Sequence, residues 1–286
     1  MSPEYEASAI LLRRAALQHG LAGQAALEGE FVPRAKVFLA EARELQLAAH
    51  RADVRGGEVA RLRSDAIDIL IDALFLRAGS AAATLSLVAT GGYGRAELCP
   101  LSDIDLLVLV PRHSAATKAL VEAILYPLWD LGLKVGQSVR TVTESTNYAK
   151  DDLHLHVALL ETRHLCGSPE LFAQLEAKTA ALLSGQAWKP FARAIVESQR
   201  KRREKAGGSA YLQEPDLKNG VGALRDVQGC VWIARTARNG VGPAGLAASG
   251  FLPAVDLQKF EEAKQVLLRL RCELHFQVTR PTEQLS

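Results

Sequence analysis

Two aspartates two residues apart, Asp103 and Asp105, stand at the entrance of an apolar run over residues 104–110. If this run is a β-strand, side chains at i and i+2 point to the same face, with Cα atoms roughly 6–7 Å apart. That separation lets both carboxylates bind one hard cation or bridge a pair of cations. Oxygen ligands of this kind favour Mg²⁺ or Mn²⁺. The spacing therefore predicts a divalent-metal site made from two carboxylates.

A glycine pair, Gly91-Gly92, follows an alternating apolar segment over residues 84–90 that predicts another strand. Glycine allows a tight turn that exposes backbone N–H groups, and such a turn can hold a phosphate. The segment 94–98 is expected to add its N-terminal amides, and Arg95 a charged contact. The pair lacks both the Gly-Lys-Ser/Thr ending of a P-loop and the G-x-G-x-x-G spacing of a dinucleotide fold. The two motifs together predict a site for a nucleotide phosphate and its metal.

Three blocks of sequence carry a family resemblance. The residues from Gly91 to Leu98, followed by Ser102 to Leu107, resemble the signature of the DNA polymerase beta-type nucleotidyltransferases, and the fuller string resembles bacterial PII-protein uridylyltransferases. Residues 128–141 agree with that group. Residues 211–228 resemble its Glu-Pro-Asn-x-Lys-x-Gly-x-Gly-Gly-Leu-Arg-Asp segment. The resemblance covers roughly residues 40–280 of the chain.

The resemblance implies an activity and its partners. A member of this group transfers UMP from UTP to a tyrosine of a PII-type nitrogen-signalling protein and releases pyrophosphate, with Mg²⁺ or Mn²⁺ as cofactor. Asp103 and Asp105 would then hold the metal. The residues expected to contact the nucleotide are Gly91, Gly92, Arg95, Ser102 and Lys218. Lys218 belongs to a Gly-flanked loop, which is expected to fold over the nucleotide or, on the alternative interpretation, to be an ordinary turn.

A third carboxylate is commonly contributed by a later strand in this superfamily. The candidate strand over residues 133–141 contains no acid. Asp151, Asp152 and Glu161 remain as candidates for this catalytic position. Glu161 is favoured because it precedes a short predicted strand. Ala223 stands where the family has glycine, which bears on the conformation of the Lys218 loop because alanine tolerates positive φ less well.

Hydrophobic periodicity predicts an α+β fold in which a small mixed sheet precedes a helical region. N-terminal helices within residues 1–80 are expected to pack on a nucleotidyltransferase core over 81–168. A helical domain over 169–286 is expected to follow, including the nucleotide-site loop at 211–228. The expected strands are 84–90, 104–110, 133–141 and 163–166, and the expected helices are 33–51, 58–77, 115–131, 151–161, 171–183, 189–205, 224–238 and 254–278.

Composition limits the class of protein. The chain has 286 residues with a formal net charge of +2, so its overall charge does not favour a nucleic-acid or membrane-surface partner. The basic cluster at 200–203 is either a solvated helix face or a surface for the triphosphate or an acidic protein. Four cysteines without a C-x-x-C pair indicate free thiols in the cytoplasm, and no apolar run is long enough to span a membrane.

Full-length members of the group also carry a phosphohydrolase domain with a His-Asp doublet and two glutamine-sensing domains. The chain has no His-Asp doublet, so we expect a transferase fragment without uridylyl-removing or sensing activity. A related protein adenylyltransferase, or the nucleotidyltransferase module found with cystathionine-beta-synthase-type domains, is an alternative. An alternative of another class is a non-catalytic nucleotide-sensing module. A nucleic-acid polymerase or tRNA-end-adding enzyme is disfavoured by the charge.

Overall fold

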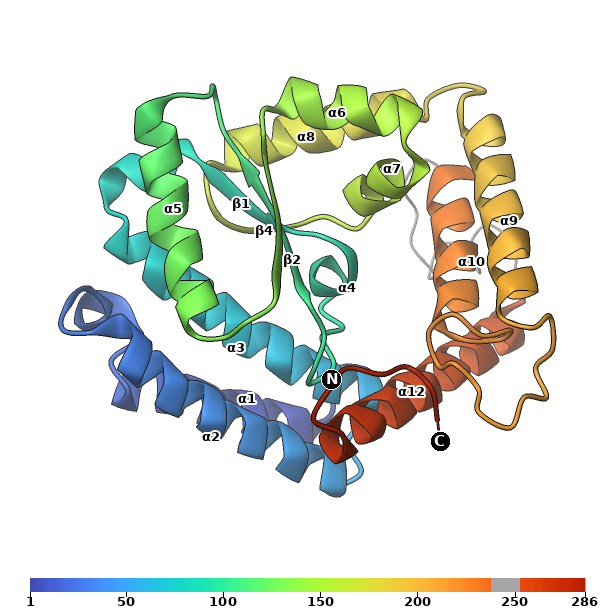
Figure 1. The fold of residues 1–286 in the computed structure, drawn as a ribbon, viewed down its shortest axis with the longest axis horizontal. Helices are drawn as coiled ribbons and strands as arrows, with labels where there is room; N and C mark the ends of the chain where they lie inside the picture. The colour runs from blue at the N-terminus through green and yellow to red at the C-terminus, as the bar shows by residue number, and fades with distance from the viewer. Residues whose placement is uncertain (238–252, 286) are drawn as a thin grey trace.

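The computed structural model describes residues 1–237 and 253–285, and it confirms the predicted α+β fold. A mixed four-stranded sheet with the order β3-β2-β1-β4 lies between two groups of helices (Figure 1). The strands are β1 Ser86–Ala89, β2 Ile104–Leu109, β3 Val135–Arg140 and β4 Arg163–Gly167. Strand β1 is antiparallel to β2 and β4, whereas β2 and β3 are parallel.

The two central strands are apolar because helices cover both of their faces. All of β1 is buried, and β2 is buried at every position except Asp105. Along β2, Leu106 and Val108 belong to one hydrophobic core, while Leu107 and Leu109 belong to the core on the other face. Asp105 shares the face of Leu107, so it marks the place where a polar site opens on that side of the sheet.

The helices form a layer on each face of the sheet. One layer contains α1, α2, α3 and α5, and the other contains α6, α7 and α8 (Figure 1). Their bounds are α1 Pro3–Gln18, α2 Phe31–Arg51, α3 Gly56–Arg77, α5 Ala115–Asp130, α6 Val142–Asp151, α7 Leu153–Leu160 and α8 Pro169–Leu182. Two 3₁₀ turns, η1 Gly23–Leu27 and η2 Ser80–Thr84, connect α1 to α2 and α3 to β1.

Three more helices extend from this core. Helices α9 Trp188–Lys205 and α10 Leu224–Ala237 pack against each other and against α7, and α12 Ala254–Gln277 packs along α3 (Figure 1). A Cβ on Gly56 of α3 would overlap the backbone of Arg269 in α12, which shows how closely these helices approach. Within residues 1–237 and 253–285, no helix combines the length and the apolar character needed to cross a membrane.

Several boundaries differ from the sequence predictions. Helices α1 and α6 were not predicted, although Thr141 and Glu144 form a reciprocal capping box that begins α6. The short helix near the glycine pair is α4, Gly91–Gly94, rather than 94–98, because the N–H groups of Gly94 and Arg95 already bond to Thr90 and Gly91. The predicted helix end at residue 238 lies outside the described residues. The division into domains at residues 80 and 168 stays a prediction.

Helix α4 offers a matched test of packing. A Cβ on Gly94 would collide with the carbonyl oxygen of Glu161, whereas a Cβ on Gly92 meets nothing nearer than 3.8 Å. We expect Gly94→Ala to lower the free energy of unfolding by about 3 kcal/mol, and Gly92→Ala to change it by less than about 1 kcal/mol. Urea denaturation of both variants measures the difference. Equal effects would contradict the close approach of α4 to Glu161.

Candidate active site

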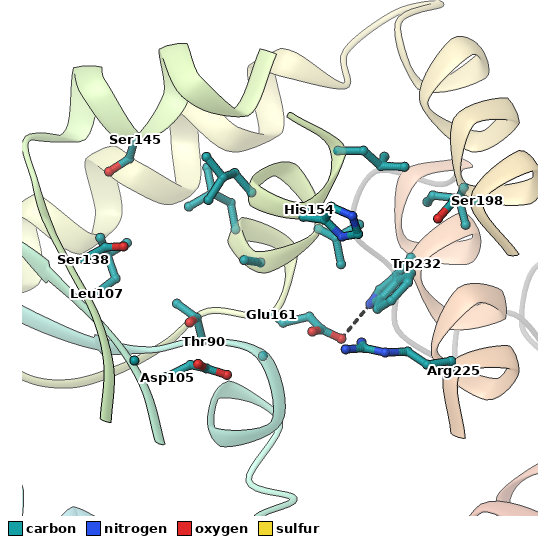
Figure 2. Close-up of a pocket in the computed structure, with 18 of the residues that line it drawn as sticks. Thr90, Asp105, Leu107, Ser138, Ser145, His154, Glu161, Ser198, Arg225 and Trp232 are labelled. Carbon is teal, nitrogen blue, oxygen red and sulfur yellow. Dashed lines mark hydrogen bonds between the residues drawn. The ribbon is translucent and has the colours of Figure 1, made fainter. Parts of the chain in front are cut away.

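A pocket of about 640 Å³ opens where the sheet faces α7, α9 and α10 (Figure 2). Thr90 and Asp105 line it from the sheet, and Ser138 lines it from β3. Arg225 and Trp232 of α10 form the opposite wall. The pocket therefore brings Gly91 and Asp105, one residue of each predicted motif, together with residues more than a hundred positions away from Asp105 in sequence.

The carboxylate of Asp105 lies between two glycines. A Cβ on Gly91 would stand 3.1 Å from Oδ2 of Asp105, and a Cβ on Gly136 would stand 2.8 Å from Oδ1. Gly136 is placed there by the parallel register that pairs it with Asp105, and Gly91 has a φ of 56°, which favours glycine. Asp103 lies just before the strand, two residues away, and its charge acts on Asp105. Any side chain at residue 136 would press on the Asp105 carboxylate.

The pKa of Asp105 is affected by charged residues that are far away in the sequence. Burial raises the pKa of Asp105, and the negative charge of Asp103 raises this pKa further. Lys218 and Arg225 act in the opposite direction, so both lie close enough to influence Asp105. Burial in turn lowers the pKa of Lys218 and of Arg225. The structure thus brings the predicted Lys218 to the two aspartates and adds Arg225.

Arg225 was not predicted as a site residue, and Arg202 was predicted only as a member of the basic cluster at 200–203, with a surface for the triphosphate or an acidic protein as one of its two interpretations. Arg225 donates a hydrogen bond to Gln228 at 2.8 Å and has no acidic partner among the described residues. It belongs to the Leu-Arg-Asp end of the third sequence block, which was the signal available for it. Arg202 of α9 also lines the pocket and pairs with Asp226. The members of the basic cluster of α9 therefore differ in environment. The side chain of Arg202 faces the pocket and is 17% exposed, whereas that of Arg200 is 60% exposed.

The Lys218 loop is held by the end of the described chain. Asp216 accepts hydrogen bonds from the backbone N–H groups of Lys218 and Asn219 at 2.7 and 2.6 Å, and it forms an antiparallel bridge with Gln284. Glu283 lies 3.8 Å from the Nζ of Lys218 and 2.6 Å from Arg271. These contacts fix a loop whose conformation the sequence left open.

The structure shows how Ser102 and Ala223, two residues singled out in the sequence, are placed. Ser102 accepts a hydrogen bond from Arg271 at 3.3 Å, so its hydroxyl contacts α12 in this structure. Ala223 is buried and is not among the residues with positive φ, whereas Gly222 has a φ of 76°. The departure from the family glycine at residue 223 therefore causes no backbone strain.

Glu161 lines the pocket, and its carboxylate pairs with Arg95. Arg95 Nη1 is 2.6 Å from Oε2 of Glu161, and Trp232 Nε1 donates to Oε1 at 2.6 Å (Figure 2). The side chain of Glu161 is 3% exposed and that of Arg95 is 15% exposed. Both residues predicted to contact ligand are therefore engaged by protein partners.

The other candidates for a third carboxylate lie elsewhere. Asp152 caps α7 through the N–H groups of His154 and Leu155, and Asp151 is exposed at the end of α6. Among residues 1–237 and 253–285, no group of three or more His, Cys, Asp or Glu side chains is arranged to hold a metal ion. The assignment of Asp103 and Asp105 as the acidic pair of the site stays a prediction.

Comparison with protein families agrees with this geometry. Residues 76–159 match the nucleotidyltransferase domain, and residues 190–286 match the family described as GlnD PII-uridylyltransferase. The first match contains the glycine pair, the two aspartates and β3, and the second contains α10, the Lys218 loop and α12. The fold and the site together define a nucleotidyltransferase domain with an attached helical region.

Curated relatives identify the family more narrowly. Proteins named bifunctional uridylyltransferase/uridylyl-removing enzyme are 39% identical over 203 residues in Cereibacter sphaeroides, 40% over 209 in Bradyrhizobium sp. strain ORS 278, and 38% over 203 in Rhodospirillum rubrum. These alignments cover 71%, 72% and 71% of the chain and 22% of each relative. The chain belongs to this family and spans about a fifth of the length of these members.

A buried histidine beside the site predicts how the protein responds to acid. His275 accepts a hydrogen bond from the N–H of Leu101 at 3.2 Å, and burial lowers its pKa to about 4. An unfolded histidine has a pKa near 6.5. The neutral form therefore stabilises the fold above pH 6.5, and this contribution is lost as the pH falls from 6.5 through about 4.

We expect this histidine to account for about 3 kcal/mol of the loss in unfolding free energy across that pH range. Urea denaturation at successive pH values measures it. His275→Gln keeps a hydrogen-bond acceptor but takes up no proton, so its stability should depend less on pH. An identical pH dependence in the variant and the natural protein would be the contrary result.

Proposed function

We propose that the pocket binds UTP with divalent metal and transfers UMP to a tyrosine of a PII-type signalling protein, with release of pyrophosphate. The observation that carries this proposal is the Asp105 carboxylate, which lies beside Asp103 between two glycines and faces Lys218 and Arg225. A pair of carboxylates that pairs with no cationic side chain within residues 1–237 and 253–285 suits Mg²⁺ or Mn²⁺. The names of the relatives support UTP as the nucleotide and PII protein as the acceptor.

The residues of the chain have separate tasks in this reaction. Asp103 and Asp105 would hold the metal, which when bound supplies positive charge to the transferring group and to the departing oxygen. The amides at Gly91 and Gly92 contact phosphate oxygens. Lys218 and Arg225 neutralise the charge that develops on pyrophosphate. A phenol has a pKa near 10, so only about a thousandth is ionised at neutral pH. The acceptor tyrosine therefore needs a metal or a nearby carboxylate to assist the loss of its proton.

The compartment belongs to the same proposal. Cys99 and Cys272 are free thiols whose sulfur atoms lie 3.3 Å apart, and Cys166 and Cys230 are also free. Persistent thiols at such separation suit a reducing environment. We therefore place the reaction in the cytoplasm, where nucleotide triphosphate and a soluble acceptor are both present.

The direct test is transfer of label from UTP to a purified PII-type protein in the presence of Mg²⁺ or Mn²⁺, with mass analysis of the modified tyrosine. We expect Asp103→Asn and Asp105→Asn each to lower turnover by roughly 100- to 1,000-fold, because each removes charge stabilisation from the transition state. ATP in place of UTP tests the adenylyltransferase alternative. Metal-dependent UTP binding without any transfer would favour a nucleotide-sensing module, and retained turnover in either variant would exclude the two-carboxylate mechanism.

Gly136 provides a second test of the same site. Gly136→Ala places a methyl group 2.8 Å from Oδ1 of Asp105 and forces the carboxylate to move. We expect Mn²⁺-dependent UTP binding to weaken by about tenfold, while thermal stability changes little because alanine is acceptable in a strand. Calorimetric titration measures the binding. Val139→Ala on the same strand is the control, and similar losses in both variants would contradict a specific effect on Asp105.

A further inference from the structure

The carboxylate of Glu161 is fully engaged by two partners from different parts of the fold. Glu161 follows the last turn of α7, and its side chain is 3% exposed. One oxygen accepts a hydrogen bond from Trp232 of α10, and the other pairs with Arg95 at the end of α4, both at 2.6 Å. The residue therefore connects the sheet side of the pocket to the helical side (Figure 2).

Arg95 continues this connection away from the pocket. Its Nε donates to Glu97 at 2.7 Å, and the other oxygen of Glu97 lies 2.7 Å from Nζ of Lys264 in α12. The four side chains alternate in charge from Glu161 to Lys264, and each carboxylate has a cationic neighbour. A buried guanidinium between two carboxylates needs both of them, because removing one leaves a charge in a poorly solvated place. Glu161 is thus committed to Arg95.

Trp232 continues the connection on the side of α10. Its indole is 6% exposed, and the guanidinium of Arg225, two turns earlier on the same face of α10, lies 5.8 Å from its ring centroid. Arg235 of the same helix donates to the carbonyl oxygen of Leu160 at 2.5 Å. The segment around Glu161 therefore sets the position of the helix that carries Arg225. The same segment contacts Gly94 of α4 through the backbone.

We propose that Glu161 is a positioning residue rather than a third metal-holding carboxylate. Its carboxylate is a strut between Arg95 and Trp232 that sets the separation of the glycine turn and α10. The two walls that receive the phosphates, one with Gly91 and Gly92 and the other with Arg225, are held at a fixed distance by it. This inference rests on the proposed nucleotidyl transfer. Glu161 contributes to the binding of UTP and not to the binding of metal.

The test compares Glu161→Gln with Trp232→Phe. Glutamine offers one acceptor and one amide donor, so it satisfies only one of the two partners, whereas phenylalanine removes only the indole N–H and keeps most of the ring volume. We expect each variant to raise KM for UTP by about tenfold with a smaller change in kcat, since a misplaced wall weakens phosphate binding. Binding of Mn²⁺ alone, followed by its paramagnetic resonance signal, should stay within about twofold of the natural protein.

Two controls make the result decisive. Asp105→Asn should weaken Mn²⁺ binding, which the strut variants should not do. Trp129→Phe alters a tryptophan that is 41% exposed on α5 and should leave KM unchanged. Thermal unfolding reports whether each variant is folded, and Trp232→Phe carries the test if Glu161→Gln does not fold.

The contrary outcome is also specific. Loss of Mn²⁺ affinity in Glu161→Gln equal to that in Asp105→Asn, with no change of KM in Trp232→Phe, would make Glu161 a metal ligand and overturn the strut. If the natural protein transfers no UMP, the proposed function fails. The strut is then judged by the dissociation constant for UTP with Mn²⁺, measured by tryptophan fluorescence in Glu161→Gln and by calorimetry in Trp232→Phe. An unchanged constant in both variants overturns it.

Discussion

Repulsion between the carboxylates of Asp103, just before β2, and Asp105, within β2, is the constraint on which the rest of the site depends. The charge of Asp103 raises the pKa of Asp105. Protein cations must balance this charge without pairing with the carboxylates, because direct ion pairs would occupy the oxygens that a metal needs. Lys218 and Arg225 meet that requirement from the helical part of the chain. The helical region is therefore part of the site and not an appendage to it.

The remaining contacts keep those cations in place. Glu283 approaches Lys218 and pairs with Arg271, while the Asp216 side chain caps the turn that presents Lys218. On the other side, Trp232 anchors the helix of Arg225 to Glu161. Most of these side chains are buried or half-buried, and charged groups in such surroundings are strongly coupled to one another. These polar contacts add to the apolar packing of Ile195 and Trp232 that joins α9 and α10 beside the pocket.

The parts of the site that were predicted from the sequence depend on local spacing. A glycine pair after a strand and two acids before another are visible within a few residues, as are most helix periodicities. The parts that were missed depend on which segments become neighbours. The role of Gly136 follows from the register between β2 and β3, and the partner of Glu161 is 71 residues further along the chain. Chemical type and local position made Arg95 and Glu161 candidates, whereas the structure shows that each is held by other side chains of the protein.

The bridge between Asp216 and Gln284 has a consequence for how the protein folds. The aspartates and the glycine turn form from neighbouring segments of the chain, but the loop of Lys218 is completed only when the last described residues return to it. Contacts between segments so far apart in sequence close large loops and form slowly. The pairing of β1 with β2, which places the glycine turn beside the aspartates, therefore closes a shorter loop than the bridge that completes the Lys218 loop. A nascent chain ending before α12 would carry the carboxylates without the completed Lys218 loop that accompanies them in the native fold.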